Sequence, residues 1–275
     1  MLDKNTVNEI QKKIFINKSP FPYTLIKDAL PLDIITKAEN DFISFRNFER
    51  GDENFRYGNA KYSLEKFNKM PESIKNIISF FYSENFLKLL EKNFKLKDVK
   101  PDWTLYGAGM HNSARGNHLT VHSDFVYQRH NTKTRRVLNL LLYLNSDWKD
   151  EWNGHIELWD KKMTKKVQSI SPSLNNMLLF RTDKDSNHGF PDKLLCPEHI
   201  TRKSIALYYY VDEKRVLPLQ IKKRKYFTTV WKKRPNSNDP KFMDQDNIWR
   251  KIKTFYFYLQ KVRQNKQVMY MIYRT

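Results

Sequence analysis

LTVHSDF, residues 119–125, is the stretch on which the interpretation of this chain depends. Successive side chains of a β-strand point to opposite faces, so His122 and Asp124 would lie on one face and could reach one metal ion. Taken alone the pair is weak, because a His-x-Asp sequence arises by chance and also fits a surface strand with a polar face. Its meaning therefore depends on the rest of the chain.

A second histidine lies far downstream. His188 is 64 positions after Asp124, in DSNHGFPD, where glycine and proline indicate the end of a strand. Two imidazoles and one carboxylate on one face of an octahedral ion leave three positions open, as in the facial triad of non-haem Fe(II) oxygenases. O2 and a bidentate 2-oxo acid both need such positions. We therefore expect His122, Asp124 and His188 to be the Fe(II) ligands and the catalytic residues.

A candidate anion-binding pair comes next. Arg202 begins RKSIALYYYV, residues 202–211, whose β-branched and aromatic residues are typical of a strand. Arg202 and Ser204 would share one face of that strand. A guanidinium pairs bidentately with a carboxylate, and the serine hydroxyl can add a further hydrogen bond. The far carboxylate of 2-oxoglutarate is the ligand that we expect there.

Four longer stretches resemble one known family. They are PFPYTLIKDALPLDIITKAENDF (20–42), RRVLNLLLYLN (135–145), WNGHIELWD (152–160) and SISPSLNNMLLFRTDKDSNHGFP (169–191). Together with the His-x-Asp strand, they make about residues 106–212 similar to the 2-oxoglutarate/Fe(II)-dependent dioxygenases, in particular the prolyl 4-hydroxylase-like branch. His155 departs from the pattern, because it stands where the family usually has the second glycine of a turn.

The resemblance implies a fold. We expect an α+β chain with a mainly β core, which is a double-stranded β-helix, or jelly-roll, of two sheets with the iron between them. Helices at about 31–46 and 72–92 would buttress the jelly-roll from outside. The strand-rich part would run from 101 to 212, and a basic, helical C-terminal extension would follow.

The resemblance also implies roles for single residues. Tyr143 and Tyr106 would join Arg202 and Ser204 in binding 2-oxoglutarate. Arg136 would contact the substrate at the mouth of the pocket, and Tyr208 would line that pocket. Other interpretations stay open. Tyr143 or Tyr208 could be an ordinary core residue, and Arg136 could be a solvated charge at a strand edge.

Composition limits the setting. The chain has 275 residues, enough for one sizeable domain with an appendage. It contains no stretch of about 18 apolar residues and no visible secretory signal. Cys196 is its one cysteine, so an intrachain disulfide is impossible. We therefore expect a reducing, cytoplasmic setting, in which Fe(II) is also preserved better.

Positive charge is concentrated at the C-terminal end. The net charge is +20, and residues 213–275 contain 17 Lys and Arg against 4 Asp and Glu. We expect a domain over 1–212 and an extension over 213–275, with a helix that begins at Asp239 and Pro240. Its apolar face would pack on the domain. Alternatively, the extension contacts nucleic acid or another anionic surface.

The resemblance implies a dioxygenase that hydroxylates a C–H bond, with Fe(II), 2-oxoglutarate and O2, and with ascorbate as a supporting reductant. The expected substrate is a peptidyl proline. One alternative is a small metabolite, such as an amino acid or a sugar. Another is a non-catalytic jelly-roll that binds an anionic partner through its basic tail, and a third is a cupin-like protein with another metal and no 2-oxo acid.

Overall fold

The computed structural model describes residues 2–44, 49–50, 62–128, 131–212 and 229–239. The chain divides into two compact units, Met1–Asp239 and Pro240–Thr275, and the first unit contains all of these residues. The expected helix after Pro240 and the basic run at 222–225 lie outside the described residues. The predicted domain boundary at 212 therefore stays a prediction.

Among the described residues, four α-helices belong to the N-terminal part. They are α1 (Lys4–Lys13), α2 (Leu32–Ser44), α3 (Glu72–Phe81) and α4 (Glu84–Phe94), with single 3-10 turns at η1 (Phe67–Lys69) and η2 (Asp150–Trp152). The expected helix at 31–46 is confirmed as α2. The single helix expected at 72–92 is wrong: it is divided into α3 and α4, because the Ser83 hydroxyl caps a new helix by accepting from Phe86 N.

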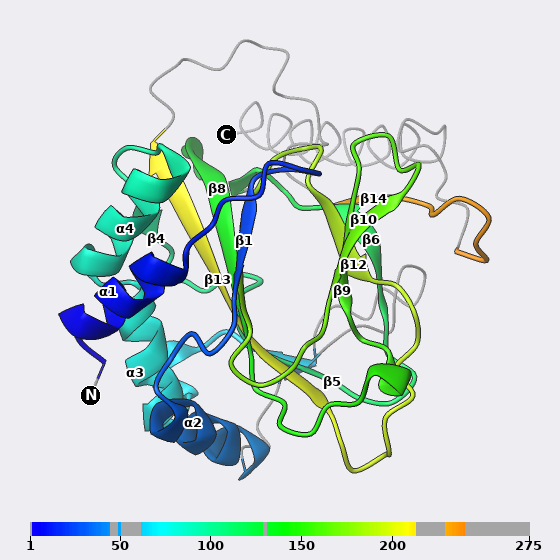
Figure 1. The fold of residues 1–275 in the computed structure, drawn as a ribbon, viewed down its shortest axis with the longest axis horizontal. Helices are drawn as coiled ribbons and strands as arrows, with labels where there is room; N and C mark the ends of the chain where they lie inside the picture. Colours follow the sequence, from blue (N-terminus) through cyan, green and yellow to red (C-terminus); the bar gives the residue numbers. More distant parts are fainter. Residues whose placement is uncertain (1, 45–48, 51–61, 129–130, 213–228, 240–275) are drawn as a thin grey trace, which may run out of the picture. The chain divides into compact units, whose positions relative to one another are not determined.

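Two antiparallel sheets form the core of the unit (Figure 1). The larger sheet contains β1 (Tyr23–Ile26), β11 (Met177–Arg181), β8 (Asn131–Tyr143), β13 (Arg202–Asp212), β5 (Gly109–Ser113), β3 (Tyr62–Leu64) and β2 (Glu49–Arg50), in that order, with β4 (Lys100–Pro101) on β13 and β7 (Tyr127–Gln128) on β8. The smaller sheet contains, in order, β10 (Lys166–Ile170), β9 (Ile156–Trp159), β12 (Asn187–Phe190), β6 (Leu119–Ser123) and β14 (Val230–Trp231).

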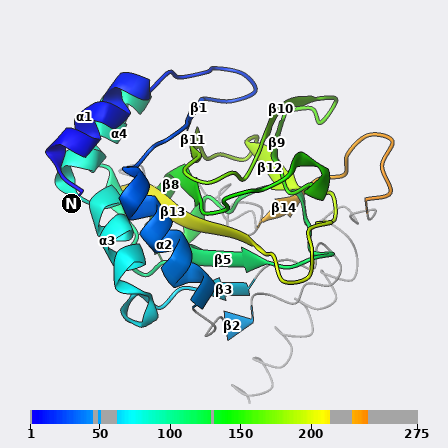
Figure 2. The ribbon, with the colours of Figure 1, turned by 60° about the horizontal axis from the view of Figure 1, so that its bottom comes forward.

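The helices cover one face of the larger sheet (Figure 2). The side chains of strand β13 point alternately to the two faces of this sheet, and those of odd number point toward the helices. Lys203 forms a buried ion pair with Glu39 of α2 (Nζ to Oε1, 3.3 Å), and the Tyr209 hydroxyl donates to the Phe81 carbonyl of α3 (3.1 Å). Side chains of even number, beginning with Arg202, therefore point to the opposite face, toward the smaller sheet.

A second, smaller core fills the space between the two sheets. It joins Tyr143, Leu178 and Phe180 of the larger sheet to Ile156 and Leu158 of the smaller one. The expected jelly-roll core with buttressing helices is confirmed. Among the described residues, none of the helices has the length and apolar character that a membrane crossing requires.

Candidate metal centre

Two neighbouring strands of the smaller sheet bring the three expected ligands together. His122 of β6 lies directly opposite His188 of β12 in the ladder, and Asp124 follows β6 by one residue. The Asp124 carboxylate lies between the imidazoles, with Oδ1 at 3.5 Å from Nε2 of His122 and Oδ2 at 3.4 Å from Nε2 of His188. One ligand atom from each residue lies within 4.8 Å of the others, and all three residues are buried.

Backbone carbonyls orient both imidazoles. Nδ1 of His122 lies 2.8 Å from the Thr120 carbonyl, and Nδ1 of His188 lies 2.9 Å from the Ser186 carbonyl. A carbonyl oxygen only accepts, so each Nδ1 carries the proton and each Nε2 presents its lone pair. Hydrogen bonds of this kind fix the tautomer of metal-binding histidines.

The charge states also suit a divalent cation. Burial lowers the pKa of His188 to about 4, so its imidazole is neutral near pH 7. Burial would raise the pKa of Asp124, but the Arg136 charge and the two histidines hold it well below its usual range. Metal ligands must be deprotonated, and His188 and Asp124 already are at neutral pH.

Arg136 and Asn139 hold the outer oxygen of Asp124. Nη2 of Arg136 donates to Oδ2 at 3.0 Å, and Nδ2 of Asn139 donates to the same oxygen at 2.8 Å. Nε of Arg136 also donates to Oδ1 of Asn139 at 2.7 Å. Asn139 was not among the residues predicted from the sequence. Its one signal was a polar residue within the apolar strand RRVLNLLLYLN.

A bulge in β8 turns both residues to the same side. Leu138 is paired with Tyr209 and Arg136 with Tyr210, so Val137 is skipped in the ladder. Without this extra residue, Arg136 and Asn139, three positions apart, would point to opposite faces. The bulge therefore places a buried cation beside Asp124.

The expected position of Arg136 at the mouth of a pocket is wrong. The residue has 0% exposure, and its guanidinium carbon lies 3.2 Å from the centroid of the Tyr208 ring. Tyr208 is buried too, and its hydroxyl donates to the Gly107 carbonyl at 2.6 Å. In this structure Tyr208 supports the cation that faces Asp124.

Arg202 lies buried on the face of the larger sheet that carries Ser204 and Tyr143, which are directly opposite each other in the β13–β8 ladder. Its Nε donates to the Gly154 carbonyl at 2.7 Å, and Nη2 lies 3.4 Å from the Tyr143 hydroxyl. Among the described residues it forms no ion pair. Burial lowers the pKa of Arg202, yet a guanidinium stays charged in proteins. A buried cation without a carboxylate favours an anionic ligand.

Tyr106 lies elsewhere. It is 52% exposed, and its ring contacts Phe125, with 5.9 Å between the centroids. Phe125 directly follows Asp124 in the sequence, so Tyr106 contacts the neighbour of a candidate ligand. The exposure of Tyr106 differs from the burial of Arg202, Ser204 and Tyr143, with which it was expected to act.

The turn before β9 accommodates His155. Asn153 and Gly154 take the positive φ angles of 61° and 80°. His155 has no such angle, so the turn does not require glycine at that position. The imidazole of His155 instead lies 3.2 Å from the Asp150 carboxylate.

The residues fit the expected metal and co-substrate. Two imidazole nitrogens and one ionised carboxylate make the donor set that Fe(II) takes in oxygenases. The buried Arg202 is suited to the carboxylate of a 2-oxo acid. Both features belong to the space between the two sheets.

Residues 108–210 match the family model described as 2OG-Fe(II) oxygenase superfamily. A prolyl-4-hydroxylase from Pseudomonas putida is similar in structure, with 14% identity and a TM-score of 0.50, covering 78% of this chain and 100% of its own. A prolyl hydroxylase from Trichoplax adhaerens, in complex with a peptide fragment of hypoxia inducible factor, is also similar in structure. Its identity is 19% and its TM-score 0.52, and the match covers 77% of this chain and 91% of its own. No curated protein matches this chain.

At these identities the two structures show the fold, and the family match concerns residues 108–210. The match covers β5 to β13, which include every residue of the His-Asp-His cluster and Arg202. Over residues 108–210 the chain therefore matches the 2OG-Fe(II) oxygenase superfamily, and its fold is prolyl 4-hydroxylase-like; this match and the His-Asp-His cluster support a 2-oxoglutarate-dependent dioxygenase that uses Fe(II), 2-oxoglutarate and O2.

Proposed function

We propose that this protein hydroxylates a C–H bond of a peptidyl proline. In this proposal His122, Asp124 and His188 bind Fe(II), and Arg202 binds the C5 carboxylate of 2-oxoglutarate. The observation that carries these roles is the buried guanidinium of Arg202, which has no carboxylate partner among the described residues. It lies on the face of the larger sheet that points toward the smaller sheet, and the three metal ligands lie on, or directly after, strands of that smaller sheet.

Each protein group has a separate task. The bound Fe(II), 2-oxoglutarate and O2 together supply the oxidising power, and the chain supplies positions and a dry environment. The Gly154 carbonyl fixes the Arg202 side chain through Nε, and Nη2 lies beside the Tyr143 hydroxyl, so the outer edge of the guanidinium can pair with a carboxylate. Ser204 and Tyr143 offer hydroxyls on the same face. Arg136 and Asn139 hold Oδ2 of Asp124, which leaves Oδ1 for the metal.

Two observations support a peptide substrate. The Trichoplax protein of similar fold is a prolyl hydroxylase in complex with a peptide fragment. In the present chain, the Tyr106 ring contacts the ring of Phe125, the residue that directly follows Asp124, and Tyr106 is half exposed. Aromatic faces of this kind suit the apolar ring of proline. The same rings would also accept a small apolar metabolite, which is therefore the alternative substrate class.

The first test is anaerobic titration of 2-oxoglutarate into the Fe(II)-loaded protein, monitored by the weak visible charge-transfer band. We expect the band in the parent protein and its loss in His188→Ala. In Arg202→Met the titration midpoint should rise about ten- to more than a hundredfold, because a charge-assisted hydrogen bond contributes about 1.5–3 kcal/mol. Ser204→Ala should shift it less. A folded, iron-loaded parent without the band would contradict the proposal and favour a non-catalytic metal-binding module.

The second test concerns the substrate. Succinate formation is measured with proline-containing peptides and with the same peptides carrying alanine in place of proline. Stimulation by the proline peptides alone, with a mass gain of one oxygen on proline, supports the proposal. Stimulation by free amino acids or sugars, and by none of the peptides, would assign the chain to small-metabolite hydroxylases.

A further inference from the structure

Residues 229–239, here called the edge segment, lie beyond the family match and add a strand to the smaller sheet. Strand β14 pairs with β6, with Val230 opposite Ser123 and Trp231 opposite His122. Lys232 N donates to the Val121 carbonyl at 2.7 Å. We propose that Trp231 is a positioning residue of the metal centre, which holds the His122 imidazole, and that Arg234 fastens the edge segment in place.

The register sets the direction of the Trp231 side chain. Residues directly opposite each other in an antiparallel ladder point to the same face of the sheet. His188, His122 and Trp231 therefore form a row across three adjacent strands, on the face that carries the metal ligands. The Trp231 ring lies 5.1 Å from the His122 ring, and the His188 ring lies 4.6 Å from it on the other side.

Strand β6 would otherwise be an edge. In the order β10-β9-β12-β6-β14, β14 alone among the described strands separates the metal-binding strand from the end of the sheet. An unpaired edge exposes backbone groups to water, and its side chains are held on one flank only. Because the ring of Trp231 covers the free flank of His122, it limits the orientations that the imidazole can take and excludes water from that side.

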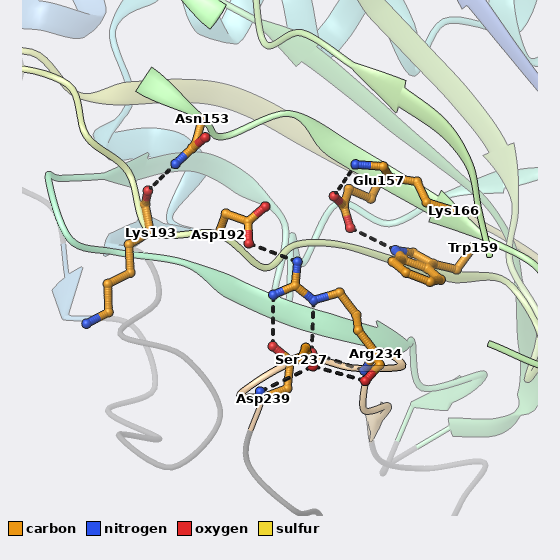
Figure 3. Close-up of polar contacts among 9 residues, drawn as sticks. All are labelled: Asn153, Glu157, Trp159, Lys166, Asp192, Lys193, Arg234, Ser237 and Asp239. Atoms are coloured by element: carbon orange, nitrogen blue, oxygen red, sulfur yellow. Dashed lines mark hydrogen bonds and ion pairs between the residues drawn. The ribbon is translucent and has the colours of Figure 1, made fainter. Parts of the chain in front are cut away.

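A two-residue strand needs further attachment, which Arg234 supplies (Figure 3). Its Nε and Nη2 donate to the two carboxylate oxygens of Asp239, at 3.0 and 2.9 Å. Its Nη1 donates to Oδ1 of Asp192 at 2.9 Å. The Ser237 hydroxyl donates to the Arg234 carbonyl at 3.0 Å and accepts from Asp239 N at 3.3 Å, which closes the turn.

Asp192 connects this cluster to the second histidine. It lies four residues after His188, in the loop that follows β12. The edge segment thus contacts the strand of His122 through β14 and the chain beyond His188 through Arg234. Both histidine-bearing strands are tied to one external element, so loosening that element should disturb the spacing of the two Nε2 atoms.

The experiment uses Co(II) as the probe metal, with the full-length protein and no substrate. Two readouts monitor the titration: the visible d–d bands of bound Co(II), and quenching of tryptophan fluorescence by the bound ion. The variants are Trp231→Ala, Trp231→Phe and Arg234→Met. Lys233→Met is the control, because it removes one positive charge from the neighbouring, exposed position of the same segment.

We expect Trp231→Ala to weaken Co(II) binding about tenfold, since groups that orient metal-binding histidines typically contribute ten- to a hundredfold to metal affinity. Trp231→Phe should keep the Co(II) affinity within about twofold of the parent value, because an aromatic ring still covers His122. It should also lose the most strongly quenched part of the tryptophan fluorescence, because the tryptophan nearest to the metal is gone. Arg234→Met should weaken Co(II) binding in the same direction as Trp231→Ala, and the double variant should be no weaker than Trp231→Ala. Lys233→Met should bind as the parent does.

Parent-like Co(II) affinity in both Trp231→Ala and Arg234→Met, with unchanged circular dichroism, would overturn the proposal. If Trp231→Ala does not fold, the Co(II) affinity of Arg234→Met tests the role of the edge segment. The loss of fluorescence quenching in Trp231→Phe then tests whether Trp231 lies close to the bound ion. The test is independent of the primary substrate and of 2-oxoglutarate. Failure of the proposed prolyl hydroxylation would therefore leave this result unchanged, and the reverse also holds.

Discussion

Arg136 and Asp124 form a buried ion pair that exists because of one extra residue in a strand. Nη2 of Arg136 lies 3.0 Å from Oδ2 of Asp124, and the bulge at Val137 is what turns the arginine inward. The pair gives a buried carboxylate a permanent counter-charge. Oδ1 of Asp124 stays available to a metal. In the metal-free protein, Arg136 balances the charge of the buried carboxylate.

The first prediction rests on that counter-charge. Arg136→Gln should destabilise the metal-free protein by about 3–5 kcal/mol, because it leaves a buried carboxylate without its partner. A divalent metal would replace part of the lost positive charge, so the gain in stability on metal addition should be larger in the variant than in the parent. Urea unfolding in the presence of EDTA, then of Co(II), measures both effects. Lys162→Gln, which removes a positive charge from an exposed position, is the control and should have little effect.

The second prediction concerns the carbonyl that holds Arg202. Gly154 has a φ of 80°, and a Cβ there would lie 2.7 Å from Leu194 and 3.2 Å from Cδ of Arg202. Gly154→Ala should therefore displace the guanidinium and raise the midpoint of 2-oxoglutarate binding severalfold, although no polar group is removed. Gly116 has the same φ of 80° with nothing within 4 Å of the added methyl, so Gly116→Ala should cost only the backbone strain. Equal titration midpoints in the two variants would contradict this account.

The third prediction concerns metal removal. A ligand that binds only the folded state stabilises it by about 2.7 kcal/mol at a hundred times its Kd. For a unit of this size that corresponds to a rise in Tm of roughly 5–10 °C. Thermal unfolding with Co(II) and with EDTA should show this difference in the parent and in His199→Ala, whose histidine is exposed. The difference should vanish in His122→Ala and in His188→Ala.

The fourth prediction concerns pH. Cys196 is buried among Trp148, Phe190 and Leu194, and burial raises the pKa of its thiol above the ordinary value. At any pH from about 7 to 9 the native protein should therefore contain less thiolate than a free cysteine does, and alkylation by iodoacetamide should be slow. In urea the thiol regains its ordinary pKa, and the rate should rise and depend on pH as that of a free cysteine does. Rapid alkylation of the native protein at neutral pH would show that this small core is open.

The sequence predicted the elements that obey local rules. The alternation of a strand has a period of two wherever it runs, so LTVHSDF alone placed His122 and Asp124 on one face. RKSIALYYYV likewise placed Arg202 and Ser204 together. The structure has Arg202 and Ser204 on one face of β13, and it has His122 of β6 beside Asp124, the residue that directly follows that strand. The helix at 31–46 and the strand-rich part from 101 were predicted for the same reason, since apolar periodicity is a property of a few neighbouring residues.

Other features could not be read from the sequence. One extra residue in β8 reverses the alternation, and it decides that Arg136 is buried against Asp124 instead of facing a pocket mouth. Whether 72–92 is one helix or two depends on the cap that Ser83 makes. Asn139 gained its place only when β8 came to lie beside Asp124.

By itself, therefore, the sequence determined which residue types share a strand face, because side-chain direction along a strand is set by the local backbone. Only the tertiary structure decided which faces meet. The approach of β12 to β6, the bulge in β8 and the position of Trp231 beside His122 depend on pairing between segments far apart in the chain. Such pairing is fixed by the packing of the whole unit, where a shift of one residue in register would turn each of these side chains to the other face.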